Sequence, residues 1–206
     1  MTQSFQQHFA TLLGEFVLPD ATALNQQLVG LICAEDQLQE QKMTTVKSGW
    51  QTRHGFLKQE QSAIKQLRKF IDQSLRSYVE AATRSLADRS IKLRFTYDGW
   101  ATVLLDGGYQ HQHTHSRADL VGVYCVEREL LPAGAKLGGE LTLLDPRSGK
   151  QAIQSAWNSE EVTLSPEPGK LIIFPAFLPH RVNEVSGSGH RITINFDVQV
   201  GMLPRE

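Results

Sequence analysis

The sequence predicts an α+β protein that is mainly β, with an N-terminal helical layer beside an antiparallel barrel or jelly-roll core. Three observations support this prediction. The chain is helix-like up to residue 90 and strand-like from residue 91 onward. The later strands are short, and no long helical pattern separates them, which argues against βαβ units. A length of 206 residues suits one domain with a full core, so we expect a single domain over residues 1–206.

Two amphipathic helices are expected in the first part of the chain. In residues 20–42 leucine and isoleucine recur at helical spacing after a Pro-Asp start signal. In residues 59–88 the apolar positions follow one helical face, with charged and amide side chains between them. Residues 48–55 hold turn residues and a tryptophan without periodicity, which indicates a loop or short strand. We expect the helices to support the barrel; a homodimer face is the alternative.

Short strands are expected in the rest of the chain, because β-branched and aromatic runs recur there between turn signals. These runs are residues 91–97, 100–106, 120–126, 140–145, 161–164, 170–175 and 190–200. The segment 146–160 is rich in serine, glutamine and glycine, and we expect it to be a mobile loop near the mouth of the site.

The composition of the chain indicates which partners and which cellular compartment to expect. The chain has 21 basic and 22 acidic residues, so no overall field favours nucleic acid or an anionic membrane. The N-terminus lacks the basic region of a secretory signal, and no run of about 18 apolar residues occurs. We therefore expect a soluble, cytoplasmic protein. The two cysteines, Cys33 and Cys125, form no disulfide framework and are expected to be reduced and buried.

Histidines dominate one segment of the strand-rich part. His111, His113 and His115 alternate, so in an extended segment they project to the same side. Neutral imidazole is the commonest protein metal ligand. A further histidine from a distant segment, His180, would complete one face of an octahedral ion. Positions for a co-substrate and dioxygen would stay open, as non-haem iron oxygenases require.

An anion clamp is predicted beside this metal site. Arg191 offers a planar fork that binds a carboxylate at two points, and Thr193 lies two residues further on the same strand face. A dicarboxylate chelating the metal at one end meets this arginine at its other end. His190 points to the opposite side of the strand and is not expected to be a ligand.

In order and spacing, these segments resemble the Fe(II)- and 2-oxoglutarate-dependent oxygenase superfamily, and in particular a bacterial and phage branch of it. The matching segments are His113–His115, Leu120–Tyr124, Gly138–Leu141, Asp145–Arg147, Pro168–Pro175, His180 and Arg191–Thr193, with further likeness at Asn25–Leu28 and Gly49–Thr52. The resemblance implies a double-stranded β-helix, or jelly roll, over residues 91–206, with residues 1–90 as its helical layer.

The resemblance also implies a role for each residue of the site. His113 and His115 are expected to be the paired metal ligands, and His180 the distal ligand. Arg191 is expected to bind the far carboxylate of 2-oxoglutarate. The candidate hydrogen-bond donors to the co-substrate are Thr193, Tyr124 and Thr102.

The expected cofactor is Fe(II), with 2-oxoglutarate and dioxygen as co-substrates. In this superfamily the oxidation of a substrate C–H bond is coupled to the decarboxylation of 2-oxoglutarate to succinate and carbon dioxide. The expected function is therefore that of a dioxygenase, most simply a hydroxylase. Its substrate is a small molecule or a peptide that the sequence does not identify, and no nucleic-acid or membrane partner is indicated.

One position departs from the superfamily pattern and keeps alternatives open. The superfamily usually has an aspartate or glutamate where this chain has His115, and the change makes the bound iron more positive by about one unit of charge. Asp119 is a further candidate carboxylate, and His111 with His113 is an alternative pair. The alternative functions are a cupin-like metal-binding or ligand-sensing module, and a three-histidine dioxygenase that uses no 2-oxoglutarate.

Overall fold

The protein is described by a computed structural model over residues 10–36, 45–83, 91–128, 138–147, 161–165, 167–186 and 190–204. Its elements, in chain order, are β1 (Gly14–Val17), α1 (Thr22–Asp36), β2 (Val46–Gln51), the 3-10 turn η1 (Phe56–Lys58), α2 (Ser62–Ala82), β3 (Ile91–His113), β4 (Leu120–Arg128), β5 (Leu141–Leu144), β6 (Glu161–Leu164), β7 (Lys170–Pro175), β8 (His180–Val182) and β9 (Arg191–Pro204).

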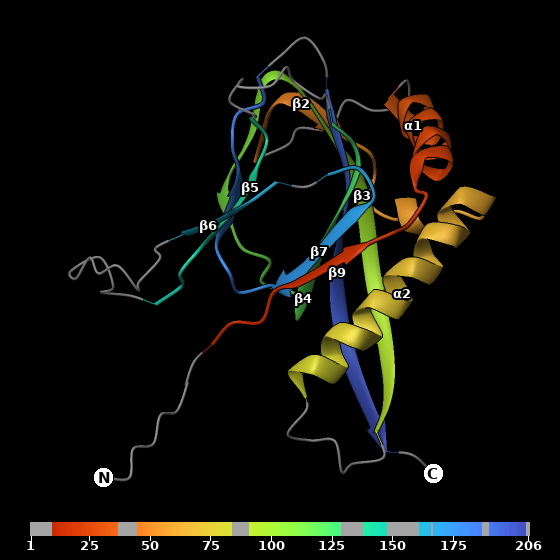
Figure 1. Ribbon diagram of the computed structural model, residues 1–206, viewed down its shortest axis with the longest axis vertical. Coiled ribbons are helices and arrows are strands. Elements are labelled where there is room, and N and C mark those ends of the chain that lie inside the picture. Colours follow the sequence, from red (N-terminus) through yellow and green to blue (C-terminus); the bar gives the residue numbers. More distant parts are fainter. Residues whose placement is uncertain are drawn as a thin grey trace.

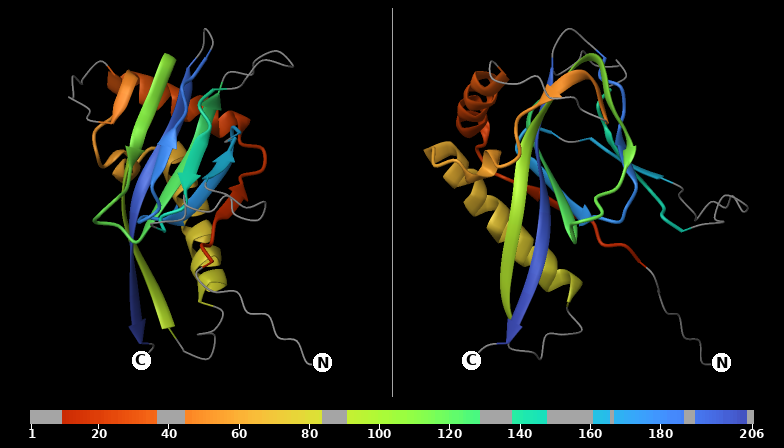
Figure 2. Two further views of the ribbon diagram at one scale, coloured as in Figure 1. Left: turned by 90° about the vertical axis from the view of Figure 1, so that its left-hand side faces the viewer. Right: turned by 180° about the vertical axis from the view of Figure 1, so that it is seen from behind.

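The strands form one sheet in the order β1-β7-β4-β9-β3-β8-β5-β6, and β2 also pairs with β3. All of these pairings are antiparallel. The sheet curls into a half-barrel, and both helices lie on its outer side (Figure 1). The view from behind shows the same curl, with the helices on its outer side (Figure 2). This architecture confirms the predicted mainly β, jelly-roll class with a helical layer.

β3 is one long strand where the sequence predicts two, and it continues into the histidine segment. The glycine between the predicted strands does not end the ladder. A Cβ on Gly99 would lie 2.5 Å from Leu57 Cδ1, so this glycine makes room for a side chain of the helical layer. Strand β9 runs beside β3 from the Ile91–Pro204 pair to the Leu104–Arg191 pair.

A second glycine lets β3 bend towards the site without losing its partners. Gly107 has a φ of 72°, a conformation in which an L side chain is strained. Its N–H donates to the carbonyl of Val185 at 2.9 Å, and Val185 in turn donates to the carbonyl of Gly108. Beyond the bend, β3 pairs with β8, and this pairing brings the histidine segment to a distant part of the chain.

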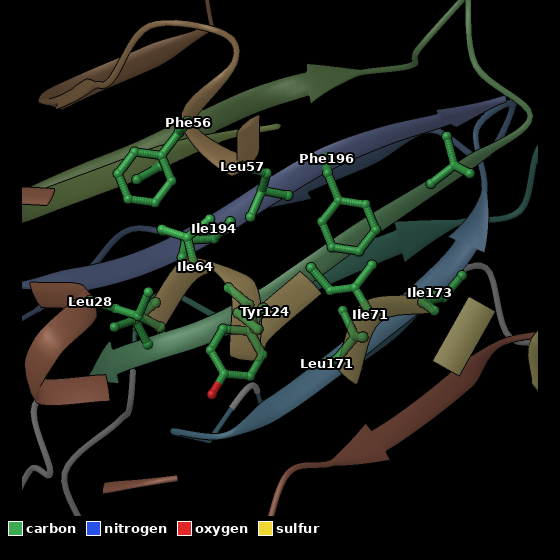
Figure 3. Close-up of a cluster of buried hydrophobic side chains, with 14 of the residues drawn as sticks. Leu28, Phe56, Leu57, Ile64, Ile71, Tyr124, Leu171, Ile173, Ile194 and Phe196 are labelled. Atoms are coloured by element: carbon green, nitrogen blue, oxygen red, sulfur yellow. The ribbon is translucent and has the colours of Figure 1, made fainter. Parts of the chain in front are cut away.

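The helical layer packs on the outer face of the sheet through an apolar stripe. The buried apolar positions of α2 recur every three or four residues: Ala63, Ile64, Leu67, Ile71, Leu75, Tyr78 and Val79. They meet side chains of α1, β4, β7 and β9 in one cluster (Figure 3). Each fully buried large side chain of this kind contributes about 1.5–3 kcal/mol. The parts of the predicted helices beyond Asp36 and Ala82 fall largely outside the described residues.

Strand β9 separates this outer core from a second core inside the curl. Its even-numbered residues Ile192, Ile194, Phe196 and Val198 belong to the outer cluster. Its odd-numbered residues Arg191, Thr193, Asn195 and Asp197 therefore face inward. The inner cluster is apolar and includes Val121, Val123, Leu141, Leu143, Ile172 and Phe174. The polar face of β9 thus lies against an apolar interior.

The segment 48–55, predicted as a loop or short strand, contains the end of β2 and leads into η1. The short strands β1 and β8 had no sequence prediction. Cys125 is buried as expected, whereas the expectation that Cys33 is buried is wrong, because it lies on an exposed face of α1. Most of the predicted loop 146–160 falls outside the described residues. Across the described ranges, no helix is both long and apolar enough to cross a membrane.

Candidate metal and co-substrate site

Three histidines from separate segments meet inside the curl. His113 ends β3, His180 begins β8, and the two are cross-strand partners. His115 lies just beyond β3, where its N–H donates to the carbonyl of Ala176 at 3.1 Å. One ligand atom from each histidine lies within 4.8 Å of the others. The ring centroids are 4.3 to 5.2 Å apart, so the three rings can face a single ion.

Two of these rings are oriented by the same local hydrogen bond. Nδ1 of His113 lies 2.7 Å from the carbonyl of His111, and Nδ1 of His180 lies 2.9 Å from the carbonyl of Leu178. Because a carbonyl only accepts, each Nδ1 carries the proton and each Nε2 keeps its lone pair. A metal-binding histidine is typically held in this way by its other ring nitrogen.

Burial keeps these two rings in the form that binds a metal. Desolvation, followed by the nearby His113 ring, lowers the pKa of His180 to about 3. Desolvation also lowers the pKa of His113, against the opposing effect of its bond to the His111 carbonyl. Both imidazoles are therefore neutral at pH 7, as metal coordination requires.

His115 has different surroundings from the other two histidines. Its Nδ1 lies 2.6 Å from Oδ1 of Asp197, and its ring stacks with Trp100 at a centroid distance of 6.2 Å. Within the described part of the chain, its buried Nε2 has no hydrogen-bond partner. An unpartnered buried nitrogen costs stability, so this atom is suited to a ligand such as a metal ion.

A small cavity lies between the three histidines. Its volume is about 20 Å³, comparable with the space needed for one water molecule or ion. The residues that line it are Trp100, Gln110, His113, His115, Val121, Val123, Leu141, His180, Val182 and Asn195. The apolar members restrict water around the histidines, while Gln110 and Asn195 add amide groups to the wall.

Arg191 is a buried cation with unused donors. Its side chain is only 2% exposed, and Nη1 donates to the hydroxyl of Thr193 at 3.3 Å. Its Nε and Nη2 are buried and have no hydrogen-bond partner among the described residues. Desolvation lowers the pKa of Arg191 to about 10, so the group remains charged at neutral pH. Two buried, charged, unpartnered donors fit an anionic ligand such as a carboxylate.

Thr102 lies on β3 between the position paired with Arg191 and the position paired with Asn195, which lines the cavity. It is the cross-strand partner of Thr193, and both are fully buried. Its hydroxyl accepts hydrogen bonds from Gln51 Nε2 at 3.0 Å and Asn195 Nδ2 at 2.7 Å. Since a hydroxyl has two lone pairs and one proton, these contacts leave its O–H to donate. The role of Thr102 as a hydrogen-bond donor to the co-substrate stays a prediction.

Tyr124 does not reach the site, and its predicted role is corrected. Its side chain belongs to the outer cluster between the sheet and the helices (Figure 3). Its hydroxyl donates to Oδ1 of Asn25 in α1 at 2.7 Å. Tyr124 therefore ties the helical layer to β4, on the face of the sheet opposite Arg191.

The remaining candidates take positions outside the histidine cluster. His111 contributes its carbonyl to His113, and its own ring contacts Tyr109 instead of the other histidines. Asp119, the further candidate carboxylate, accepts from the N–H of Val200 at 2.8 Å and does not belong to the histidine cluster. His190 pairs with Glu127, in agreement with its predicted exclusion.

Sequence reasoning missed Asp197 and Asn195, which belong to the inner face of β9. The signal was available, because the alternation that places Arg191 and Thr193 on one face continues to both residues. The expected metal triad and arginine clamp do lie on this one interior surface. Metal and co-substrate binding by these residues stay predictions, although the unpartnered Nε2 of His115 and the donors of Arg191 fit such ligands.

The sequence of the site matches a known family. Residues 98–197, which contain the three histidines and Arg191, match the family model described as "Putative 2OG-Fe(II) oxygenase". The name implies Fe(II) and 2-oxoglutarate. No curated protein is significantly similar to the chain.

Solved structures show the same fold. The chain is similar to a Pseudomonas putida prolyl-4-hydroxylase, with 15% identity, a TM-score of 0.62, and coverage of 94% of this chain and 93% of that chain. It is similar to a Trichoplax adhaerens prolyl hydroxylase in complex with a hypoxia inducible factor peptide fragment, with 11% identity, a TM-score of 0.58, and coverage of 90% of this chain and 82% of that chain. It also resembles a Burkholderia pseudomallei oxidoreductase of the 2OG-Fe(II) oxygenase family, with 12% identity, a TM-score of 0.50, and coverage of 90% of this chain and 84% of that chain. At these identities the likeness establishes the fold alone.

Proposed function

We propose that this chain, which belongs to the Fe(II)- and 2-oxoglutarate-dependent oxygenase superfamily, is an active dioxygenase and most simply a hydroxylase. His113, His115 and His180 would hold the metal ion, and Arg191 would bind the far carboxylate of 2-oxoglutarate. The bound iron and co-substrate supply the oxidising chemistry that inserts oxygen into a substrate C–H bond.

The observation that carries this proposal is the state of Arg191. A buried arginine with two unpartnered donors costs stability, because charged groups that lose water need compensating partners. A metal-binding module needs no such group beside its ion. A carboxylate at this position would satisfy Nε or Nη2, and Thr193 and Thr102 would add hydroxyl donors along the same wall.

The protein's own contribution is to hold and orient the reactants. The carbonyl contacts of His113 and His180 place the proton of each ring on Nδ1 and leave both Nε2 atoms able to bind a metal ion. Val121, Val123 and Leu141 limit water in the cavity between the histidines. Dry, fixed surroundings strengthen the interaction between Arg191 and a carboxylate, because the effective dielectric constant is low there. These features support binding of 2-oxoglutarate in one orientation, with its other end at the metal.

A turnover assay under air tests the proposal. Purified protein with Fe(II) and ascorbate is incubated with 2-oxoglutarate, and succinate is measured with and without a panel of acceptors. Prolyl peptides are the first acceptors to try, because two of the similar folds are named prolyl hydroxylases. We expect Fe(II)-dependent succinate formation that an acceptor stimulates, with one oxygen atom added to that acceptor.

Two variants make the assay specific. Arg191→Met removes the proposed clamp, and Arg181→Met removes an arginine that pairs with Glu161 on the surface. We expect the first change to abolish succinate formation and the second to leave it intact. Dioxygen consumption without succinate would contradict the proposal in favour of a three-histidine dioxygenase that uses no 2-oxoglutarate. Metal binding with neither dioxygen consumption nor succinate across the panel would favour a metal-binding module.

A further inference from the structure

The carboxylate of Asp197 lies inside the curl of the sheet, and the proposed function gives it no role. It lies on the inward face of β9, where the strand pairs with Asp98 of β3 on one side and Val121 of β4 on the other. Its side chain is 32% exposed as a whole, yet its Oδ1 is buried. A buried carboxylate oxygen costs free energy unless a donor lies close to it.

The group nearest to that oxygen is His115. Its Nδ1 lies 2.6 Å from Oδ1, within the distance of a charge-assisted hydrogen bond. His113 and His180 each donate Nδ1–H to a backbone carbonyl two residues earlier. For His113 and His180 the acceptor is a backbone carbonyl, and for His115 the carboxylate of Asp197 occupies the corresponding place. With Nδ1 protonated, the buried Nε2 of His115 keeps its lone pair for the ion.

The charge of Asp197 matters as well as its position. Three neutral imidazoles leave a divalent ion with its full double charge, whereas a carboxylate ligand would remove one unit. A carboxylate hydrogen-bonded to a ligand imidazole makes that ring a stronger base and places a negative charge close to the ion. Asp98, its cross-strand partner, contacts His54 and Lys58 and none of the three histidines. The two aspartates therefore face different partners from adjacent positions.

We propose that Asp197 is a positioning residue of the metal site, which holds His115 through Nδ1 and supplies the negative charge that three histidine ligands lack. This inference rests on the proposed metal site. It does not depend on the use of 2-oxoglutarate or on turnover. Asp197 acts through His115 without touching the reacting atoms.

Metal affinity without co-substrate is the direct test. Mn(II), which binds such sites without air oxidation, is titrated into the metal-free protein and followed by electron paramagnetic resonance. Loss of a carboxylate partner of a ligand histidine typically weakens metal binding about 10- to 100-fold, and we expect this for Asp197→Asn. The matched control Asp98→Asn removes a charge from the opposite position on β3 and should change the dissociation constant less than about 3-fold.

A second pair of variants separates this role from a purely structural one. In the His115→Asp background the new ligand is a carboxylate, which needs a donor beside it and repels Asp197. We therefore expect Asp197→Asn to leave Mn(II) affinity unchanged or to increase it in that background, the reverse of its effect in the wild type. Melting temperatures of all four proteins without metal check that each is folded.

Three results are distinguishable. No Mn(II) binding by the wild type would overturn the proposed metal site itself, and this inference with it. Wild-type binding with an unchanged dissociation constant in Asp197→Asn would overturn the inference alone. An equal loss of affinity from Asp197→Asn in both backgrounds would also overturn it, because the effect would not pass through the imidazole of His115.

Discussion

His113 and His180 are cross-strand partners whose ring centroids lie 4.3 Å apart, although a large part of the chain separates them. Desolvation and the nearby His113 ring both oppose protonation of His180, and desolvation lowers the pKa of the half-buried His113, so both rings are neutral at pH 7. Each ring also donates Nδ1–H to a carbonyl of its own segment. The lowered pKa of His180 in this pair leads to a prediction about acid.

Acidification should destabilise the metal-free protein through His180. Its pKa is about 3 in the folded state and ordinarily 6.5, so the unfolded chain binds more protons between these values. The free energy of unfolding should therefore fall as the pH drops below about 6.5, at up to about 1.4 kcal/mol per pH unit for one proton. Above that range this contribution is constant. Urea unfolding at pH 7 and pH 5 measures it.

His180→Gln should reduce this pH dependence, because the titrating group is gone. His190→Gln, a change at a histidine that pairs with Glu127 outside the cluster, should keep most of it. If His180→Gln and the wild type lose the same stability between pH 7 and pH 5, His180 is not the group responsible.

Arg191→Met should leave the metal-free protein at least as stable as the wild type. The change removes a buried charge with two unpartnered donors and keeps an apolar stem of similar length. With Mn(II) present, 2-oxoglutarate at 100 times its dissociation constant should stabilise the wild type by about 2.7 kcal/mol and the variant not at all. Denaturant unfolding with and without 2-oxoglutarate checks both statements. A loss of several kcal/mol without ligand would mark Arg191 as a structural residue.

Gly139→Ala should disturb the clamp through direct contact. Gly139 has a φ of 79°, and a Cβ there would lie 2.9 Å from Cδ of Arg191. Gly107→Ala is the matched control, since its φ of 72° imposes a similar backbone strain but a Cβ there meets open space. Both changes should cost about 1 kcal/mol or more in stability, as expected at positive φ. Only Gly139→Ala should weaken 2-oxoglutarate binding in calorimetry; equal weakening by both would contradict this packing.

Tyr124→Phe tests the placement of Tyr124 outside the site. The change removes the donor to Oδ1 of Asn25 and should cost about 1–3 kcal/mol in unfolding free energy, because a buried acceptor loses its partner. The dissociation constant for 2-oxoglutarate should stay within about 2-fold of the wild type. Thr102→Val, which removes a hydroxyl on the inner face, should instead raise that constant. A raised dissociation constant in Tyr124→Phe and an unchanged one in Thr102→Val would contradict the placement of Tyr124 outside the site.

The meeting of His113, His115 and His180 was predictable, because two of these histidines alternate in one short segment and the resemblance to the oxygenase superfamily implied the distant third. The face of the sheet on which the Tyr124 side chain lies could not be predicted. Strand β4 is buried on both sides, so its run of apolar residues has no period-two pattern. β8 has only three residues, too few for any periodicity. In the continuous strand β3, Gly99 is packed against Leu57 from a distant segment, where no larger side chain fits. Such long-range contacts leave no local signal.

The most direct test of the proposed site is an anaerobic titration of the metal-free protein with Fe(II) and then 2-oxoglutarate. Chelation of Fe(II) by the 2-oxoacid produces a visible metal-to-ligand charge-transfer band. We predict that the band appears on addition of 2-oxoglutarate and is lost in His180→Ala, whose ligand imidazole is missing. Fe(II) bound by the wild type, with no band at saturating 2-oxoglutarate, would contradict the proposed co-substrate site.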